Sequence, residues 1–329
     1  MSASCARVYQ SVSYKRIEKN MINYSIIIPH KNSQELLAYC LATIPVRDDV
    51  QVIVVDDNSD ATKVDFEHFP KWEGKHFEYY LTKEGKGAGY ARNVGLEHAE
   101  GTWVLFVDAD DYMQPCVGKI FDREVNTDAD IIYFRPKAVM LKDRTEPSYR
   151  MEYYNDIINE YQRTGDETRL RVRFYSPTCK FIRMSMIRAN QIRFEETRYS
   201  NDNYFSAHIG CCAKKVVVRD DNYYMVTQGE NTLVSDFCKK EGERETRADV
   251  IIRTSALLKK YGYEVDFKAV STVISPFLFT DKRKYRHYIK ALLEQGYSKW
   301  YLTKNIFNSP KWKARTWRRA YSLCATCGL

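Results

Sequence analysis

The sequence predicts an α/β protein with a mostly parallel, doubly wound sheet flanked by helices and a helical C-terminal region. From residue 24 onward, short apolar runs alternate with stretches of helical periodicity, and polar residues directly follow several of the apolar runs. From about residue 245 onward the pattern is helical. Such alternation is typical of parallel sheets, whose strands are joined by crossover helices.

The first strands and helix can be followed along the chain. Residues 24–28 ("YSIII") predict a buried strand that Pro29 stops, and the following helix has Ser33 as its N-cap. Residues 51–55 ("QVIVV") predict the second strand and residues 77–81 ("FEYYL") the third.

The middle of the chain continues the same pattern. Residues 89–99 ("GYARNVGLEHA") predict a helix ended by Gly101, and residues 102–107 ("TWVLFV") predict the fourth strand. Residues 130–134 predict another strand. Further on, residues 176–194 predict a strand-like piece followed by a helix, and residues 214–229 predict a strand, a turn and a second strand.

The composition is that of a soluble globular protein, with 44% hydrophobic and 29% charged residues. No apolar run approaches the ~20 residues that span a bilayer, and the N-terminus lacks the apolar core of a secretory signal. Nine cysteines without regular spacing indicate reduced thiols in a cytoplasmic protein. Cys324 and Cys327 have metal-ligand spacing, but no second pair or nearby histidine completes a site.

The net charge of +8 is concentrated at the C-terminal end, where no acidic residue follows Glu294. There, lysines and arginines alternate with aromatic residues such as Trp300 and Trp312. Segments of this composition bind the headgroup region of anionic membranes, and a basic helix packed on its own domain is the alternative. Nothing in the sequence resembles a nucleic-acid-binding module, so no nucleic acid is expected as a partner.

Three carboxylates directly follow the fourth strand, namely Asp108, Asp110 and Asp111. Like charges this close raise one another's pKa unless a cation or a bound ligand compensates them. Mg²⁺ and Mn²⁺ prefer oxygen ligands, and Mg²⁺ is typically held by one or two carboxylates together with substrate phosphates. The cluster therefore indicates either a metal site or a solvated turn.

Two further motifs lie at or near predicted strand ends. In "VVDDNSD", Asp56 and Asp57 can accept a hydrogen bond from a base or from ribose, although a turn explains the same residues. In "GAGYARNVGL", the glycines allow close backbone approach and Arg92 can meet a phosphate or carboxylate, although an ordinary loop is the alternative. Because ligands bind beyond the carboxyl ends of parallel strands, residues 29–32, 56–59 and 108–111 should line one crevice.

In this order, "SIIIPHKN", "VIVVDDNSD" and "GAGYARNVGLEHAEGTWVLFVDADD" resemble the N-terminal half of family 2 glycosyltransferases, which have the Rossmann-like GT-A fold. The resemblance is close over residues 24–115 and looser to about residue 235. It implies a flexible extension (1–22), a GT-A catalytic domain (23–235) and a helical basic region (236–329). Within the catalytic domain, residues 23–115 would form the nucleotide-binding half and residues 116–235 the acceptor half.

The resemblance also implies a donor site at the strand ends. Asp56 would take the base-contacting position, with Asp57 in support. Asp108 would contact the ribose or the donor sugar, and Asp110 together with Asp108 would bind Mn²⁺ or Mg²⁺. The other residues implied in the nucleotide-sugar site are Pro29, Lys31, Asn32, Arg92 and Ala109, whereas His30 is expected to be a loop residue.

An inverting transferase needs a base on the acceptor side. The family pattern that precedes this base is matched by Lys180, Ile187, Ile192, Phe194 and Glu195. Asn201 and Asp202 then stand where the family has a Glu-Asp pair, so the resemblance implies Asp202 as the general base. The alternative is that Asp202 caps a helix over residues 203–210.

The resemblance implies an inverting glycosyltransferase that moves a sugar from a nucleotide-sugar, with a UDP-sugar favoured, to a glycan or glycolipid acceptor. By family analogy it belongs to bacterial surface polysaccharide synthesis, such as lipopolysaccharide, O-antigen or capsule. Peripheral attachment to the inner face of the plasma membrane is a further expectation. One alternative is a nucleotidyltransferase, although "PHKNSQE" lacks the glycines of its phosphate loop. Another is a degenerate sugar-nucleotide binder, which only Asn201 supports.

Overall fold

The computed structural model describes residues 21–229 and 242–304. Nearly all of the expected N-terminal extension, the basic tail beyond Lys304 and the Cys324/Cys327 pair lie outside the described residues. The expected boundary between residues 235 and 236 lies outside them as well. The boundary at residues 115 and 116 stays a prediction.

The strands are β1 (Tyr24–His30), β2 (Val50–Asp57), β3 (His76–Thr82), β4 (Trp103–Phe106), β5 (Tyr112–Met113), β6 (Ile131–Phe134), β7 (Lys137–Met140), β8 (Lys180–Arg183), β9 (Val216–Arg219) and β10 (Tyr224–Gln228). The helices are α1 (Gln34–Thr43), α2 (Ala88–His98), α3 (Val117–Glu124), α4 (Glu152–Thr164), α5 (Thr168–Arg173), α6 (Met184–Ala189), α7 (Asn201–Cys212), α8 (Glu243–Lys260), α9 (Phe267–Ile274), α10 (Phe277–Thr280), α11 (Lys282–Glu294) and α12 (Lys299–Leu302).

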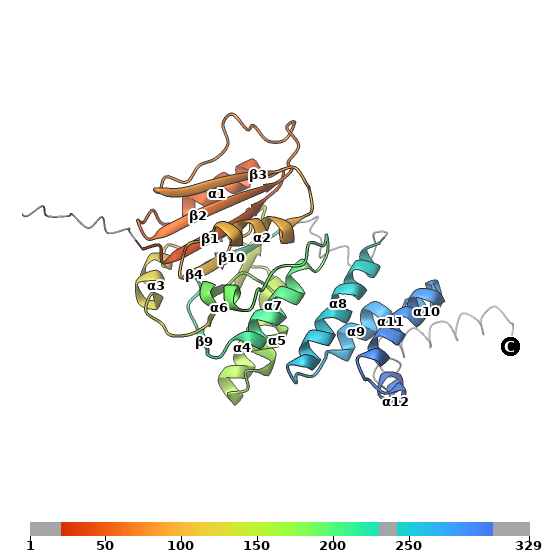
Figure 1. The fold of residues 1–329 in the computed structure, drawn as a ribbon. Coiled ribbons are helices and arrows are strands. Elements are labelled where there is room, and N and C mark those ends of the chain that lie inside the picture. Colours follow the sequence, from red (N-terminus) through yellow and green to blue (C-terminus); the bar gives the residue numbers. More distant parts are fainter. Residues whose placement is uncertain (1–20, 230–241, 305–329) are drawn as a thin grey trace, which may run out of the picture.

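The predicted mostly parallel sheet is confirmed as a seven-stranded sheet with the order β3-β2-β1-β4-β8-β6-β9. The first four strands in that order are parallel, with Ile27 of β1 paired to Ile53 of β2 and to Phe106 of β4. Strand β8 runs antiparallel to both of its neighbours. Figure 1 shows this sheet with helices around it. The carboxyl ends of β1, β2 and β4 therefore lie at one edge.

Pro29 does not stop the first strand, because β1 continues through it to His30. Strand β4 pairs with β1 only as far as Ile27. Pro29 thus lies where one neighbour has already ended, and the lost backbone donor costs little there.

Helix α2 lies close against β1, and glycines make this possible. A Cβ on Gly95 would lie 2.4 Å from the Cγ2 atom of Ile27. The helix ends at His98 with Ala99 as its C-cap, so the prediction that Gly101 ends it was wrong. Gly101 is needed for a different reason, because a Cβ there would lie 2.6 Å from the backbone nitrogen of Ser25.

The strand, turn and strand expected at residues 214–229 are β9 and β10, which belong to different sheets. Strand β9 extends the large sheet, whereas β10 joins β5 and β7 in a three-stranded sheet. Since β5 directly follows the acidic cluster, β10 is brought beside that cluster. Helices α4 and α5 carry no signal that the sequence analysis recognised.

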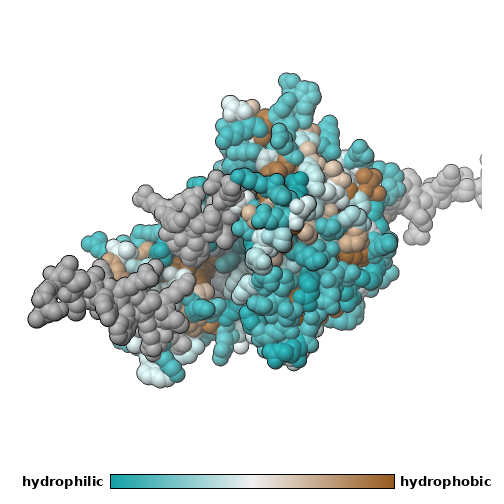
Figure 2. Space-filling view, turned by 180° about the vertical axis from the view of Figure 1, so that it is seen from behind, coloured by the Kyte–Doolittle hydropathy of each residue, from teal (hydrophilic) through white to brown (hydrophobic). Residues whose placement is uncertain are grey.

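The helical C-terminal region is confirmed as α8 to α12, which lie to one side of the large sheet in Figure 1. Helix α8 packs on α7, and the later helices share an apolar cluster that includes Val270, Ile274 and Leu292. None of the helices in the described ranges is both long and apolar enough to cross a membrane. Figure 2 shows a mainly hydrophilic face with scattered hydrophobic patches.

Gly210 tests how tightly α7 packs against α5. A Cβ at this position would lie 1.8 Å from the backbone oxygen of Arg171. We expect Gly210→Ala to lower the free energy of unfolding by about 1 to 3 kcal/mol, since the backbones must separate. Urea denaturation measures the change. The matched control is Gly118→Ala in α3, where a Cβ meets nothing within 4 Å and stability should not fall. Equal effects of the two substitutions would contradict the close packing.

Candidate functional site

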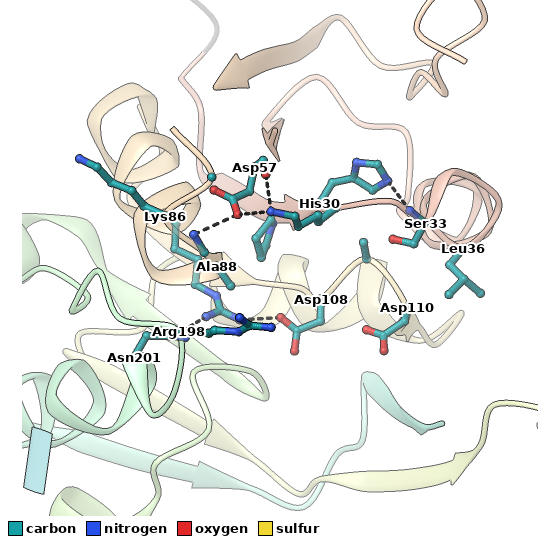
Figure 3. Close-up of a pocket in the computed structure, with 16 residues that line it drawn as sticks. His30, Ser33, Leu36, Asp57, Lys86, Ala88, Asp108, Asp110, Arg198 and Asn201 are labelled. Atoms are coloured by element: carbon teal, nitrogen blue, oxygen red, sulfur yellow. Dashed lines mark hydrogen bonds and ion pairs between the residues drawn. The ribbon is translucent and has the colours of Figure 1, made fainter. Parts of the chain in front are cut away.

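A pocket of about 750 Å³ opens at the carboxyl ends of β1, β2 and β4. It is lined by Pro29, His30, Lys31, Ser33, Leu36, Asp57, Gly85, Lys86, Gly87, Ala88, Arg92, Asp108, Ala109, Asp110, Arg198 and Asn201. Figure 3 shows Asp108 and Asp110 side by side on one wall, with Arg198 and Asn201 nearby. The expected crevice therefore forms, because parallel strands end at the same edge.

Most of the residues expected in the donor site line this pocket, namely Pro29, Lys31, Asp57, Arg92, Asp108, Ala109 and Asp110. Asn32, Asp56 and Asp202 do not. Asn32 instead ties β1 to the segment after β2. Its backbone nitrogen donates to the Ser59 Oγ atom at 2.8 Å, and its side-chain oxygen accepts from the Asp60 backbone nitrogen at 2.7 Å.

Asp56 does not line the pocket, and both oxygens of its buried carboxylate are engaged by neighbouring residues. One oxygen accepts the backbone N–H of Ser59 at 2.8 Å, and the other accepts from the Ser59 hydroxyl and from His30 Nδ1 at 2.8 Å. Burial raises the pKa of the Asp56 carboxyl, but these hydrogen bonds outweigh burial and hold the pKa below its ordinary value.

His30 is not a loop residue, as it ends β1 and is buried. Its Nε2 accepts the backbone N–H of Ser33 at 3.2 Å, so the ring proton lies on Nδ1 and is donated to Asp56. Ser33 is the N-cap residue of α1, as predicted, although its side chain makes no capping hydrogen bond. His30 and Asp56 together hold the turn that forms one pocket wall.

Asp57 presents an unpaired carboxylate oxygen. Its Oδ2 accepts from Lys31 Nζ at 3.2 Å and from the Gly87 backbone nitrogen at 2.9 Å. Its Oδ1 is buried without a hydrogen-bond partner among the described residues. Gly87 has a φ of 95°, a left-handed conformation that favours glycine. A buried acceptor without a partner is costly unless a ligand satisfies it.

Arg92 is committed to two protein partners. Its guanidinium donates to the Asp108 carboxylate at 2.7 Å and to the Asn201 side-chain oxygen at 3.0 Å. The Arg92 side chain is 8% exposed, whereas the Asp108 side chain is 37% exposed to the pocket. Arg92 thus meets a carboxylate, as one part of the sequence analysis expected, but that carboxylate belongs to the protein. It joins β4 to the start of α7 across the pocket.

Asp110 is the carboxylate best placed for a cation. Burial, with the neighbouring Asp108 charge, raises the pKa of its carboxyl to about 6. Asp110 and Asp108 both line the pocket, and carboxylate oxygens suit Mn²⁺ or Mg²⁺. Within residues 21–229 and 242–304, no three His, Cys, Asp or Glu side chains form a group that could hold a metal ion. A ligand would therefore have to supply the remaining coordination.

Asp111 does not line the pocket and instead joins the acidic cluster to β10. Its buried carboxylate accepts from the Tyr224 hydroxyl and the Thr227 backbone nitrogen, each at 2.6 Å. The same hydroxyl accepts the Asp108 backbone N–H at 2.9 Å. Asp111 therefore fixes the backbone from which Asp108 and Asp110 project.

Asp202 lies in the first turn of α7, immediately behind the pocket-lining Asn201. Ser200 is the N-cap residue, so the alternative in which Asp202 caps the helix was wrong. The residue is partly exposed at its surface. Burial of the carboxyl nevertheless raises its pKa, an effect that the positive charge of Arg92 opposes. A raised pKa suits a carboxylate that takes a proton.

Sequence reasoning missed several wall residues. Leu36 lies in the helix predicted after the first strand, and Lys86 is a single cation between two glycines. Arg198 lies in an irregular segment without any periodicity or motif. A pattern search can find residues at strand ends, but it has no signal for a side chain that a loop brings to the pocket.

Known proteins share parts of this sequence and this fold. The model of glycosyl transferase family 2 matches residues 25–190. The TarS poly(ribitol-phosphate) beta-N-acetylglucosaminyltransferase of Staphylococcus aureus is 27% identical over 226 residues, which are 65% of this chain and 37% of TarS. A poly(ribitol-phosphate) beta-glucosyltransferase of Bacillus spizizenii is 27% identical over 223 residues, which are 64% of this chain and 33% of that protein. The alignments thus span about a third of these relatives.

Among solved structures, that of S. aureus TarS 1-349 in complex with UDP-GlcNAc is similar to this one. Its TM-score is 0.57 at 22% identity, and the match covers 83% of this chain and 80% of that one. The similarity extends through the mostly parallel sheet and shows a shared GT-A fold.

The raised pKa of Asp110 has a consequence for stability. The folded chain holds this proton up to about pH 6, whereas an unfolded aspartate releases it near pH 4. The fold therefore loses stability progressively as the pH rises from about 4 to about 6, and the full loss persists above pH 6. We expect Asp110→Asn to stabilise it by about 2 kcal/mol at pH 8 and by roughly half of that at pH 5, as measured by urea denaturation. The control is Asp48→Asn, an exposed residue paired with Lys75. A gain independent of pH would contradict the burial of charge.

Proposed function

Because this chain belongs to glycosyl transferase family 2, we propose that it transfers a sugar, with inversion, from a nucleotide-sugar to an acceptor hydroxyl. A UDP-sugar is the favoured donor. The observation that carries this proposal is the pocket itself. It combines an unpartnered Asp57 oxygen, the Asp108 and Asp110 carboxylates and the first turn of the helix that holds Asp202.

In the proposed donor complex, the base lies against Pro29 and the Asp57 side chain. The free Oδ1 of Asp57 can accept the N3–H of uracil, a donor that cytosine lacks. This reassigns the base contact from Asp56 to the next residue. Lys31 acts through Asp57, because its ammonium group donates to both the backbone and the side chain of that residue.

Asp110, together with Asp108, is proposed to hold Mn²⁺ or Mg²⁺ with the diphosphate of the donor. Such an ion neutralises the charge that develops on a departing nucleoside diphosphate. Asp110 fits this role because its carboxylate lines the pocket beside a second carboxylate, with a pKa of about 6. The Asp108 charge is already shared with Arg92, which leaves Asp110 as the principal protein ligand.

Asp202 is proposed as the general base. The acceptor oxygen attacks the anomeric carbon opposite the departing diphosphate, and the Asp202 carboxylate takes the hydroxyl proton as that bond forms. Asn201 carries an amide where the family has a glutamate. It accepts a hydrogen bond from Arg92 without adding a second negative charge beside Asp202. The base site is thus held in place by hydrogen bonding.

The acceptor is proposed to be a glycan or glycolipid of a bacterial surface polysaccharide, such as lipopolysaccharide, O-antigen or capsule. The relatives named for glycosyl transfer to poly(ribitol-phosphate) support a polymer as the acceptor class. We further propose a cytoplasmic site of action, with peripheral attachment to an anionic membrane through basic residues after Glu294. Of that basic tail, only the part up to Lys304 lies within the described residues.

A nucleotide screen tests the donor and metal assignments together. Among UDP, GDP, CDP and dTDP, we expect UDP to raise the melting temperature most, and strongly only when Mn²⁺ is added. Differential scanning fluorimetry with and without a chelator measures this. Asp57→Ala is the matched variant, and it should reduce the preference for UDP over CDP. A larger shift with GDP or CDP, or indifference to chelator, would show that the donor or metal assignment is wrong.

Substitution of the base separates an enzyme from a degenerate binder. We expect Asp202→Asn to lower kcat by about 10²- to 10⁴-fold while the UDP affinity stays within about twofold of wild type, as expected for a group that acts on the acceptor hydroxyl. Turnover assays and calorimetry measure the two quantities. The control is Asp156→Asn, an exposed aspartate of α4. Full activity of Asp202→Asn would exclude Asp202 as the base.

A further inference from the structure

Arg198 brings a free guanidinium to the pocket wall. It lies between Phe194 and the start of α7, and Figure 3 shows its side chain extending toward Asp108. Within the described part of the chain it makes no hydrogen bond or ion pair, and its guanidinium lies 5.7 Å from the centre of the Tyr199 ring. An arginine that points toward carboxylates without pairing with them is available to a ligand.

The other cations of the wall are already engaged. Lys31 pairs with Asp57 at 3.2 Å and Arg92 with Asp108 at 2.7 Å. Lys86 lies 3.6 Å from the carboxylate of Glu196, which is outside the pocket lining. Of the positive groups that line the pocket, Arg198 is therefore the one whose charge the described residues do not compensate.

The segment that carries Arg198 is held at both ends. The Asn93 side chain accepts the backbone N–H of Phe194 at 2.8 Å and donates to its carbonyl at 2.9 Å. At the other end, Asn201 is tied to Arg92. A Cβ on Gly89 would lie 2.2 Å from the backbone oxygen of Glu195, so the segment packs directly on α2. The base of the Arg198 side chain is thus fixed beside the pocket.

We propose that Arg198 is a catalytic residue that binds the diphosphate of the donor, an inference that rests on the proposed function. In the transfer, the bond between the anomeric carbon and the diphosphate oxygen breaks and its electron pair goes to that oxygen. The acceptor oxygen bonds to the carbon, and its proton goes to Asp202. The planar guanidinium donates paired hydrogen bonds to phosphate oxygens and stabilises the charge that develops there.

This role follows from where the cation is placed. The diphosphate has to lie near Asp110 if a metal joins the two, and Arg198 reaches toward the adjacent Asp108. Arg198 also lies four residues before Asp202, which is in the first turn of the helix that follows. This short stretch of chain would therefore supply both the group that takes the acceptor proton and a group that stabilises the departing diphosphate.

A comparison of UDP with uridine, which lacks the diphosphate, isolates the proposed contact between Arg198 and the diphosphate. Calorimetry with UDP and with uridine, each with Mg²⁺ and the full chain, tests Arg198→Gln and Arg198→Lys. We expect Arg198→Gln to weaken UDP binding about tenfold to a hundredfold, since it removes a charge-assisted contact, and to leave uridine binding unchanged. The UDP affinity of Arg198→Lys should fall between those of wild type and Arg198→Gln, because lysine keeps the charge but lacks the paired donors of the guanidinium. The matched control is Arg193→Gln, an exposed arginine paired with Glu97 outside the pocket lining.

Each other outcome overturns the proposal in a different way. Equal losses for UDP and uridine would show a structural role, and unchanged UDP binding would show that Arg198 does not touch the diphosphate. Unchanged UDP binding with a raised KM for the acceptor would instead assign Arg198 to the acceptor. If the wild-type chain bound none of the nucleoside diphosphates, the proposed function would fail together with this inference. Thermal melts of each variant exclude loss of folding as the cause.

Discussion

The ion pair between Arg92 and Asp108 is the contact on which the architecture of the site depends. The Arg92 side chain is buried and its guanidinium also reaches Asn201, so one side chain joins the end of β4 to the start of α7. Because the Asp108 carboxylate is partly exposed, solvent screens the pair, and its main effect is to fix the geometry of the two sides. The pocket therefore has a rigid junction between its two sides, and the geometry of Asp202 relative to the donor pocket follows from it.

The two aspartate pairs of this chain divide their work in the same way. All but Asp110 are buried, but Asp57 and Asp110 line the pocket, whereas both oxygens of Asp56 and of Asp111 are engaged in hydrogen bonds that hold the surrounding backbone. Successive side chains of a strand point to opposite sides, which explains the division for the two residues that end β2. In each pair, one carboxylate is placed to meet a ligand and the other stabilises the local fold.

Asn201 changes the charge of the site without removing its contacts. An amide oxygen accepts from Arg92 much as a carboxylate would, but it leaves Asp108 as the single acidic partner of that arginine. In the proposed donor complex, Asp108 would consequently share less of its charge with a cation, and more of that task would fall on Asp110. Burial already raises the pKa of Asp202. Because residue 201 is an uncharged asparagine, no second acid directly precedes Asp202 to raise that pKa further.

The sequence by itself determined the parallel sheet, the strand ends at which polar residues gather, the family and the helical C-terminal region. These follow from local periodicity and from motifs of adjacent residues, which is information that a single segment carries. Only the tertiary structure decided that Asp57 and not Asp56 faces the pocket, that Arg92 is already paired, that His30 is buried and that Arg198 reaches the wall. Each of these depends on a partner far away in the chain, such as Asn201 for Arg92. The pattern within one segment cannot specify which distant group will neutralise a charge or accept a proton there.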